Sequence, residues 1–247
     1  MKNKIIALFS LALLIATMSF KSTQNFETVT VIELFTSQGC SSCPPADRLL
    51  SETISDAKKH DKKIFALSFH VDYWNRLGWA DPFSDKKFSQ RQSEYATILN
   101  LQTVYTPQMI VNGSHEFVGS SKNELEDALN KSLSTKPMAN FKTLESTLQI
   151  GNPIHVKYEL DGNYAKCKIN FALVSLSETT LIKRGENGGR TLKNENVVRQ
   201  FISIPAAENG EISFDLSPVP ASSNTAIIAY IQRSDLKIVG AAMTELK

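Results

Sequence analysis

Hydrophobic and polar positions divide the chain into two parts. Between residue 26 and about residue 133, stretches with an apolar period of two alternate with stretches of helical period. The pattern predicts a strand over 26–35, a helix over 44–59, a strand over 63–70, a helix that begins at Ser84 or Asp85, a hairpin of strands 108–111 and 115–118, and a helix from Ser121 to about Leu133. Both faces of the first strand are apolar, which is typical of a central strand covered on both sides, and Glu33 is the exception.

Helical periodicity disappears after a polar, proline-containing linker at 134–140. Short apolar runs then recur at fairly regular spacing and predict strands over 154–160, 165–175, 180–183, 197–204, 212–216, 226–232 and 237–242. This pattern favours a small antiparallel β-sandwich. We therefore predict an α/β protein with a thioredoxin-like domain at 23–135, in which helices flank a mixed sheet, and a β-sandwich domain at 140–247.

The first 22 residues differ from the rest of the chain. Lys2 and Lys4 precede a nearly unbroken apolar run from Ile5 to Met18, which predicts a secretory signal peptide over 1–22. Residues 1–22 contain three lysines, Lys2, Lys4 and Lys21, and without them the chain has 24 basic and 25 acidic residues. This balance gives no indication of a nucleic-acid partner. No later apolar stretch is long enough to span a bilayer once the signal is removed, so we expect an exported protein, periplasmic or secreted.

Cys40 and Cys43 follow the first predicted strand with the spacing C-x-x-C. Beside a β-α-β pattern this spacing indicates thioredoxin-like redox chemistry, with Cys40 as the exposed nucleophile and Cys43 as the resolving thiol. The positive end of the following helix would lower the pKa of Cys40, although Pro44 and Pro45 remove two of its amide donors. A structural disulfide or half of a metal site remains an alternative. The third cysteine, Cys167, falls on an apolar face and is predicted to be a buried thiol.

Two further features support the redox hypothesis. Thr106-Pro107 directly precedes a predicted strand, and a cis peptide bond there would lay the Thr106 backbone beside the thiols to bind a substrate peptide. Glu33 lies on a strand predicted to be buried, where its raised pKa would suit it to take a proton from Cys43. The alternatives are a trans proline that ends a loop and a glutamate at an edge position.

The loop from His70 to Phe83 holds both tryptophans of the chain. Tyr73, Trp74 and Trp79 are candidates for a substrate-binding platform, or for a cluster that packs the loop onto the core. His70 is a candidate third ligand, with Cys40 and Cys43, for Cu(I) or zinc, although a lone histidine is more often structural. We predict no cofactor, with copper as the alternative.

These residues belong to longer motifs, VIELFTSQGCSSCPPAD, SFHVDYWNRLGWADPFS, RQSEYA, VYTPQMIVNG and RGENGGRTLKNENVVR. Together they resemble a secreted thioredoxin-like family known as domain of unknown function 1223. The resemblance implies a thioredoxin-like fold with an added β domain, and it implies no settled activity. Cys40, Cys43 and Pro107 match the two cysteines and the cis-proline of thioredoxins, whereas Glu33 is one residue upstream of the buried acid. The motif from Arg184 to Arg199 is expected to matter, and covering the site is one role it could have.

Three hypotheses follow from the sequence. The first is an exported thiol–disulfide oxidoreductase whose partners are protein or peptide thiols and disulfides. The second is a copper-binding protein. The third is a binding module without enzymatic activity, in which the disulfide only fixes the loop.

Overall fold

The structure is a computed structural model that describes residues 26–148, 153–215 and 224–246. The predicted signal peptide lies outside these residues. The first half of the described chain contains three α-helices and four strands in the predicted order, and one short 3-10 helix that was not predicted. They are β1 (Thr30–Thr36), α2 (Pro44–Lys59), β2 (Ile64–His70), η1 (Asn75–Leu77), α3 (Lys86–Ile98), β3 (Gln108–Val111), β4 (His115–Val118) and α4 (Lys122–Leu133).

The second half contains strands only, as predicted from the loss of helical period. They are β5 (Ala139–Thr147), β6 (Ile154–Gly162), β7 (Lys168–Leu181), β8 (Thr191–Pro205), β9 (Asn209–Phe214), β10 (Thr225–Gln232) and β11 (Ile238–Glu245). The predicted strands over 165–175 and 180–183 are one strand, β7. The separation was wrong because the consecutive polar residues 177–180 belong to a continuous strand, whose end is partly exposed.

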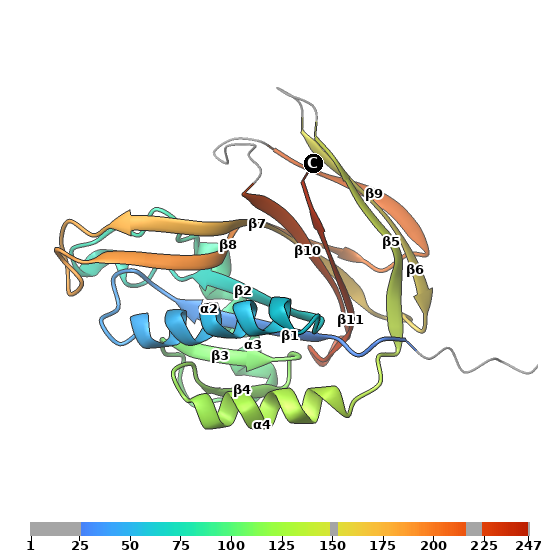
Figure 1. Cartoon of the computed structure of the whole chain (residues 1–247), viewed down its shortest axis with the longest axis horizontal. Helices are drawn as coiled ribbons and strands as arrows, with labels where there is room; N and C mark the ends of the chain where they lie inside the picture. Colours follow the sequence, from blue (N-terminus) through green and yellow to red (C-terminus); the bar gives the residue numbers. More distant parts are fainter. Residues whose placement is uncertain (1–25, 149–152, 216–223, 247) are drawn as a thin grey trace, which may run out of the picture.

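One eight-stranded sheet runs through both halves, in the order β11-β10-β7-β8-β2-β1-β3-β4 (Figure 1). β1 is parallel to β2 and antiparallel to β3, and β8 joins the sheet beside β2 through Ser68 and Val197. A separate antiparallel sheet has the order β5-β6-β9. The predicted α/β fold class, with a mixed sheet flanked by helices and a further antiparallel sheet, is therefore confirmed. The predicted domain boundary at 135–140 stays a prediction. The larger sheet combines strands that precede this boundary with strands that follow it.

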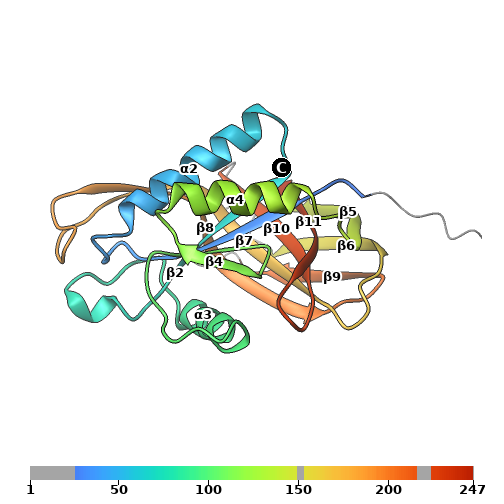
Figure 2. The same cartoon turned by 90° about the horizontal axis from the view of Figure 1, so that it is seen from below.

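Helices cover both faces of the first half of the sheet. α2 and α4 lie on one face and α3 lies on the other (Figure 2). Ile32 and Leu34 of β1 pack under α2 and α4, whereas Val31 and Phe35 pack against α3. This alternation is what a central strand with two apolar faces predicts.

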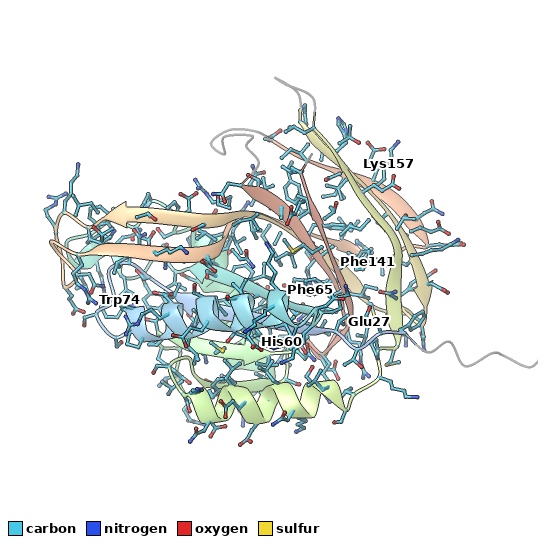
Figure 3. All side chains as sticks on the ribbon, viewed as in Figure 1. Glu27, His60, Phe65, Trp74, Phe141 and Lys157 are labelled. Carbon is cyan, nitrogen blue, oxygen red and sulfur yellow. A yellow bond between two sulfur atoms is a disulfide. The ribbon has the colours of Figure 1, made fainter. Side chains whose placement is uncertain are left out.

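The smaller sheet packs against the second half of the larger one. Its inward side chains, such as Phe141 and Val156, meet Phe171 of β7 and Ile231 of β10 in one apolar core (Figure 3). Cys167 lies at this core with 8% of its surface exposed, which confirms the prediction of a buried thiol. β7 and β8 continue beyond this core as a long hairpin that reaches the end of the molecule where α2 begins (Figure 1).

Candidate functional site

Cys40 and Cys43 form a disulfide in the loop between β1 and α2, and their Cα atoms are 5.4 Å apart. Cys43 is the N-cap residue of α2, and Pro44 begins the helix as predicted. Proline is tolerated there because the first amide groups of a helix have no intrahelical partner. The disulfide therefore lies at the N-terminus of a helix and at the C-terminal end of the central strand.

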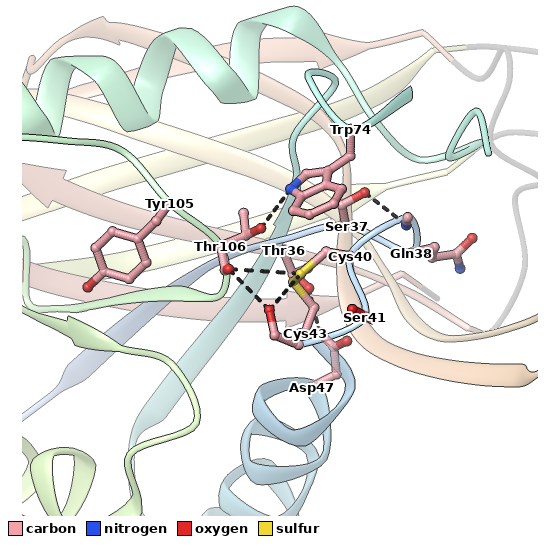
Figure 4. The surroundings of a disulfide bond; sticks show 12 residues. Thr36, Ser37, Gln38, Cys40, Ser41, Cys43, Asp47, Trp74, Tyr105 and Thr106 are labelled. Atoms are coloured by element: carbon pink, nitrogen blue, oxygen red, sulfur yellow. Dashed lines mark hydrogen bonds between the residues drawn. A yellow bond between two sulfur atoms is a disulfide. The ribbon is translucent and has the colours of Figure 1, made fainter. Parts of the chain in front are cut away.

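Both cysteines are fully buried, with no exposed surface. The prediction that Cys40 is an exposed nucleophile is therefore wrong for this oxidised state. Trp74 lies over the loop, with Nε1 donating a hydrogen bond to Thr106 Oγ1 at 2.8 Å (Figure 4). A Cβ atom added at Gly39 would lie 3.3 Å from Trp74 Cβ, so glycine allows this close approach.

Thr106 lies beside the disulfide, and the Thr106–Pro107 peptide bond is cis as predicted. The Thr106 carbonyl oxygen is 3.9 Å from Cys40 Sγ and 3.5 Å from Ser42 Oγ. The structure thus brings together four of the predicted site residues, Cys40, Cys43, Thr106 and Pro107. The role of Thr106 and Pro107 in substrate binding stays a prediction.

The tip of the β7–β8 hairpin covers the cysteine loop from the other side. Asn187 is fully buried, and its Nδ2 donates hydrogen bonds to the carbonyl oxygens of Gln38 and Cys40, both at 2.9 Å. Glu186 Oε2 accepts a hydrogen bond from the Ser41 amide at 3.0 Å. This tip includes the beginning of the Arg184–Arg199 motif that the sequence analysis expected to matter, and the structure shows that it contacts the site.

Two glycines allow the hairpin tip to meet the loop that follows β2. Gly78 and Gly185 both have positive φ angles, of 104° and 77°. A Cβ atom added at Gly78 would lie 3.5 Å from Gly185 Cα, and one added at Gly185 would lie 3.2 Å from Trp79 Cβ. A side chain at Gly185 would therefore crowd Trp79, and the positive φ angles favour glycine at both positions.

The three aromatic residues predicted to bind substrate lie in different surroundings. Trp74 contacts Thr106 at the disulfide, as described above. Trp79 Nε1 donates to Gln38 Oε1 at 3.3 Å, and the Tyr73 hydroxyl donates to Gln92 Oε1 on α3 at 3.2 Å. These contacts fasten the loop to the body of the protein, and the binding role of all three residues stays a prediction.

Glu33 is buried as predicted, but its surroundings differ from those expected of a proton acceptor for Cys43. Arg91 on α3 donates to both carboxylate oxygens, at 2.9 Å and 2.7 Å, and the Tyr230 hydroxyl donates to Oε1 at 2.5 Å. Side chains alternate along β1, which directs Glu33 toward α3, whereas α2 covers the opposite face. The geometry therefore supports a structural ion pair and gives the predicted catalytic role no support.

The buried carboxyl group that accompanies the disulfide is Asp47. It is 7% exposed and lies in the first turn of α2, where its amide donates to the Cys43 carbonyl oxygen at 3.1 Å. Its Oδ1 accepts a hydrogen bond from Thr36 Oγ1 at 2.9 Å. Burial raises the pKa of Asp47 to about 6, although the charge of His70 opposes this rise. The sequence analysis missed Asp47, although its position four residues after Cys43 places both on one face of the helix.

His70 is fully buried at the C-terminal end of β2, and its Nδ1 lies 2.7 Å from Asp81 Oδ2. Burial acts to lower the pKa of His70, but the Asp81 carboxylate outweighs it and raises that pKa. Within the described ranges, no three His, Cys, Asp or Glu side chains are grouped so that they could hold a metal ion. The copper alternative with Cys40, Cys43 and His70 stays a prediction for the reduced protein, in which the two sulfurs are separate.

In the described part of the chain, no helix has the length and apolar character needed to cross a bilayer. No curated protein sequence matches the chain. Among solved structures, a protein from Agrobacterium tumefaciens, determined by a structural genomics consortium, is 28% identical with a TM-score of 0.68; the match covers 89% of this chain and 96% of that one. HBP35 of Porphyromonas gingivalis shares the fold with a TM-score of 0.66, at 16% identity over 91% of this chain and 77% of its own.

A family model described as "Protein of unknown function (DUF1223)" matches residues 31–232, which include the disulfide loop, the Thr106–Pro107 bond and the β7–β8 hairpin. The match covers well over half of the chain, so this protein belongs to the DUF1223 family.

Proposed function

We propose that this protein is an exported thiol–disulfide oxidoreductase that acts through Cys40 and Cys43. The observation that carries the proposal is the C-x-x-C disulfide at the N-terminus of α2, with the Thr106 carbonyl beside Cys40 Sγ. The helix N-terminus favours a thiolate at this position, since it presents partial positive charge. The predicted signal peptide supports export to a compartment where disulfides persist.

The exchange follows the ordinary chemistry of thiols. A thiolate of the partner attacks Cys40 Sγ, the bond to Cys43 breaks, and Cys43 leaves as a thiolate. A second thiolate of the partner then attacks the mixed disulfide, so the partner gains a disulfide and Cys40 is released. The two electrons pass from the partner to this pair, and the reverse sequence reduces a partner disulfide.

Burial of the disulfide requires that its cover moves before exchange. Asn187 and Trp74 enclose the cysteine loop through three hydrogen bonds, to the carbonyl oxygens of Gln38 and Cys40 and to the Thr106 hydroxyl. Each such bond contributes about 1 kcal/mol. The Glu186–Ser41 and Trp79–Gln38 hydrogen bonds add to this cover. The need to open it would slow exchange with bulky partners more than with small thiols.

The same burial favours a second candidate, a binding module in which the disulfide only fixes the loop. Trapping a mixed disulfide distinguishes the oxidoreductase from the binding module. The reduced Cys43→Ser variant is mixed with a peptide disulfide, and we expect a mixed disulfide on Cys40 that the Cys40→Ser variant does not form. Cys167→Ser is the matched control, because Cys167 is a free cysteine in the other core. Absence of any mixed disulfide under native conditions would support the structural disulfide.

A further inference from the structure

A cluster of buried ionisable groups lies behind the disulfide, where β1 and β2 end. It consists of Asp47, His70 and Asp81, whose exposed fractions are 7%, 0% and 4%. The exchange described above uses none of them. Buried charges are costly, so such a cluster persists only where each group has a partner or a task.

Asp47 is placed to reach Cys43. The two residues are one helical turn apart, joined by the hydrogen bond from the Asp47 amide to the Cys43 carbonyl oxygen. Figure 4 shows the Asp47 side chain next to Cys43 on the side away from Trp74. The Thr36 hydroxyl donates a hydrogen bond to one carboxylate oxygen of Asp47, and the Asn194 side chain forms a further hydrogen bond with this carboxyl group.

His70 is held by Asp81 with one ring nitrogen left without a partner. Asp81 Oδ2 accepts from the Gln38 amide at 2.7 Å, besides lying 2.7 Å from His70 Nδ1, and Oδ1 accepts from the Phe83 amide at 3.0 Å. Among the described residues, His70 Nε2 is the buried side-chain polar atom with no hydrogen-bond partner. His70 pairs with Thr36 in the register of β1 and β2, so the imidazole lies next to the residue that holds Asp47.

An unpartnered buried nitrogen costs stability, which indicates a functional reason for it. We propose that Asp47 is the residue that exchanges a proton with the Cys43 thiol, an inference that rests on the proposed thiol–disulfide exchange. His70, oriented by Asp81, is a positioning residue whose charge tunes Asp47. When the disulfide opens, the Cys43 thiolate takes the proton from the Asp47 carboxylic acid. When it closes, Asp47 takes the proton back, and the Cys43 thiolate attacks the mixed disulfide and displaces the partner thiolate.

The charges around the cluster agree with this division of roles. Burial raises the pKa of Asp47 to about 6, and the His70 charge acts in the opposite direction. Asp47 and Asp81 both act to raise the pKa of His70, while Arg199 on β8 acts to lower it. Burial acts to raise the pKa of Asp81, but the charge and the hydrogen bond of His70 outweigh it and leave that pKa lowered. A carboxyl group that titrates near neutral pH is suited to acid–base exchange with a thiol.

The rate at which Cys43 resolves a mixed disulfide tests the proposal. The reduced protein reacts with the chromogenic disulfide dithionitrobenzoate, and release of the second thionitrobenzoate reports attack by Cys43. The rate is measured against pH for the unmodified protein, Asp47→Asn, His70→Asn and the control Glu52→Gln, an exposed carboxyl on the same helix. Asparagine preserves the shape of Asp47 and a hydrogen-bond acceptor for Thr36, so we expect the variant to fold.

For the unmodified protein, the rate should level off above about pH 6, and Asp47→Asn should slow it about 100-fold at neutral pH. In Asp47→Asn, the pH above which the rate levels off (the bend of the pH–rate profile) should move toward the ordinary cysteine pKa of about 8.5 or higher. His70→Asn should shift the bend upward because the charge that lowers the Asp47 pKa is gone. If the rate of Asp47→Asn depends on pH as that of Glu52→Gln does, the role of Asp47 is refuted, and the proposed redox function is not affected. Failure of the unmodified protein to release a second thionitrobenzoate overturns the proposed function together with the role of Asp47.

Discussion

Replacing Glu33 by glutamine tests whether this residue has a structural or a catalytic role. The Glu33 carboxylate is fully buried, and the Arg91 residue that donates to both its oxygens is 7% exposed. Glu33→Gln removes the negative charge, leaves the guanidinium uncompensated and turns an amide donor toward another donor. Loss of one partner of a buried ion pair costs about 3–5 kcal/mol, so we expect a loss of this size in the free energy of unfolding.

Unfolding in guanidinium chloride, followed by circular dichroism, measures this loss in free energy. Glu159→Gln is the matched control. Glu159 pairs with Lys142 on the surface at 2.6 Å, where ion pairs contribute little, so the control should unfold nearly as the unmodified protein does. The rate at which dithiothreitol reduces the Cys40–Cys43 disulfide should be the same in folded Glu33→Gln as in the unmodified protein. A loss below about 1 kcal/mol, or a changed reduction rate, would refute the structural assignment of Glu33.

Two further predictions concern the groups around the disulfide. Because burial raises the pKa of Asp47 from 3.8 to about 6, its contribution to stability is fully present below about pH 4 and is lost as the pH rises through 6, a change of about 3 kcal/mol. Asp47→Asn should remove this pH dependence in urea unfolding between about pH 4 and 8, and parallel curves for both proteins would count against a raised pKa. Asn187→Ala removes the hydrogen bonds to Gln38 and Cys40, so dithiothreitol should reduce the disulfide several-fold faster than in the unmodified protein. Lys193→Ala, an exposed change on the same hairpin, is the control, and equal rates in both variants would mean that the tip does not restrict access.

Local sequence pattern predicted most of the elements and the cysteine pair. The alternation of β1 placed Glu33 inside the protein, and helical periodicity predicted the bounds of α2 as the structure has them. These features depend on neighbouring residues, so the sequence alone is sufficient to find them.

The partners of these residues could not be predicted in the same way. Arg91 lies 58 positions after Glu33, and Asn187 lies 147 positions after Cys40. Periodicity carries no information about contacts at such separations. The burial of Cys40 was therefore missed, because the hairpin tip that covers it comes from the second half of the chain. Asp47 was missed for another reason, since a polar residue in the first turn of a helix also fits an exposed position.

The reduction potential of the Cys40–Cys43 pair tests the redox proposal most directly. Equilibration of the full chain with glutathione or dithiothreitol buffers, followed by alkylation and mass measurement, gives the value. An exchanging pair should lie within the range of known oxidoreductases, from about −120 to about −270 mV. A potential below about −300 mV is typical of structural disulfides and would contradict the proposal.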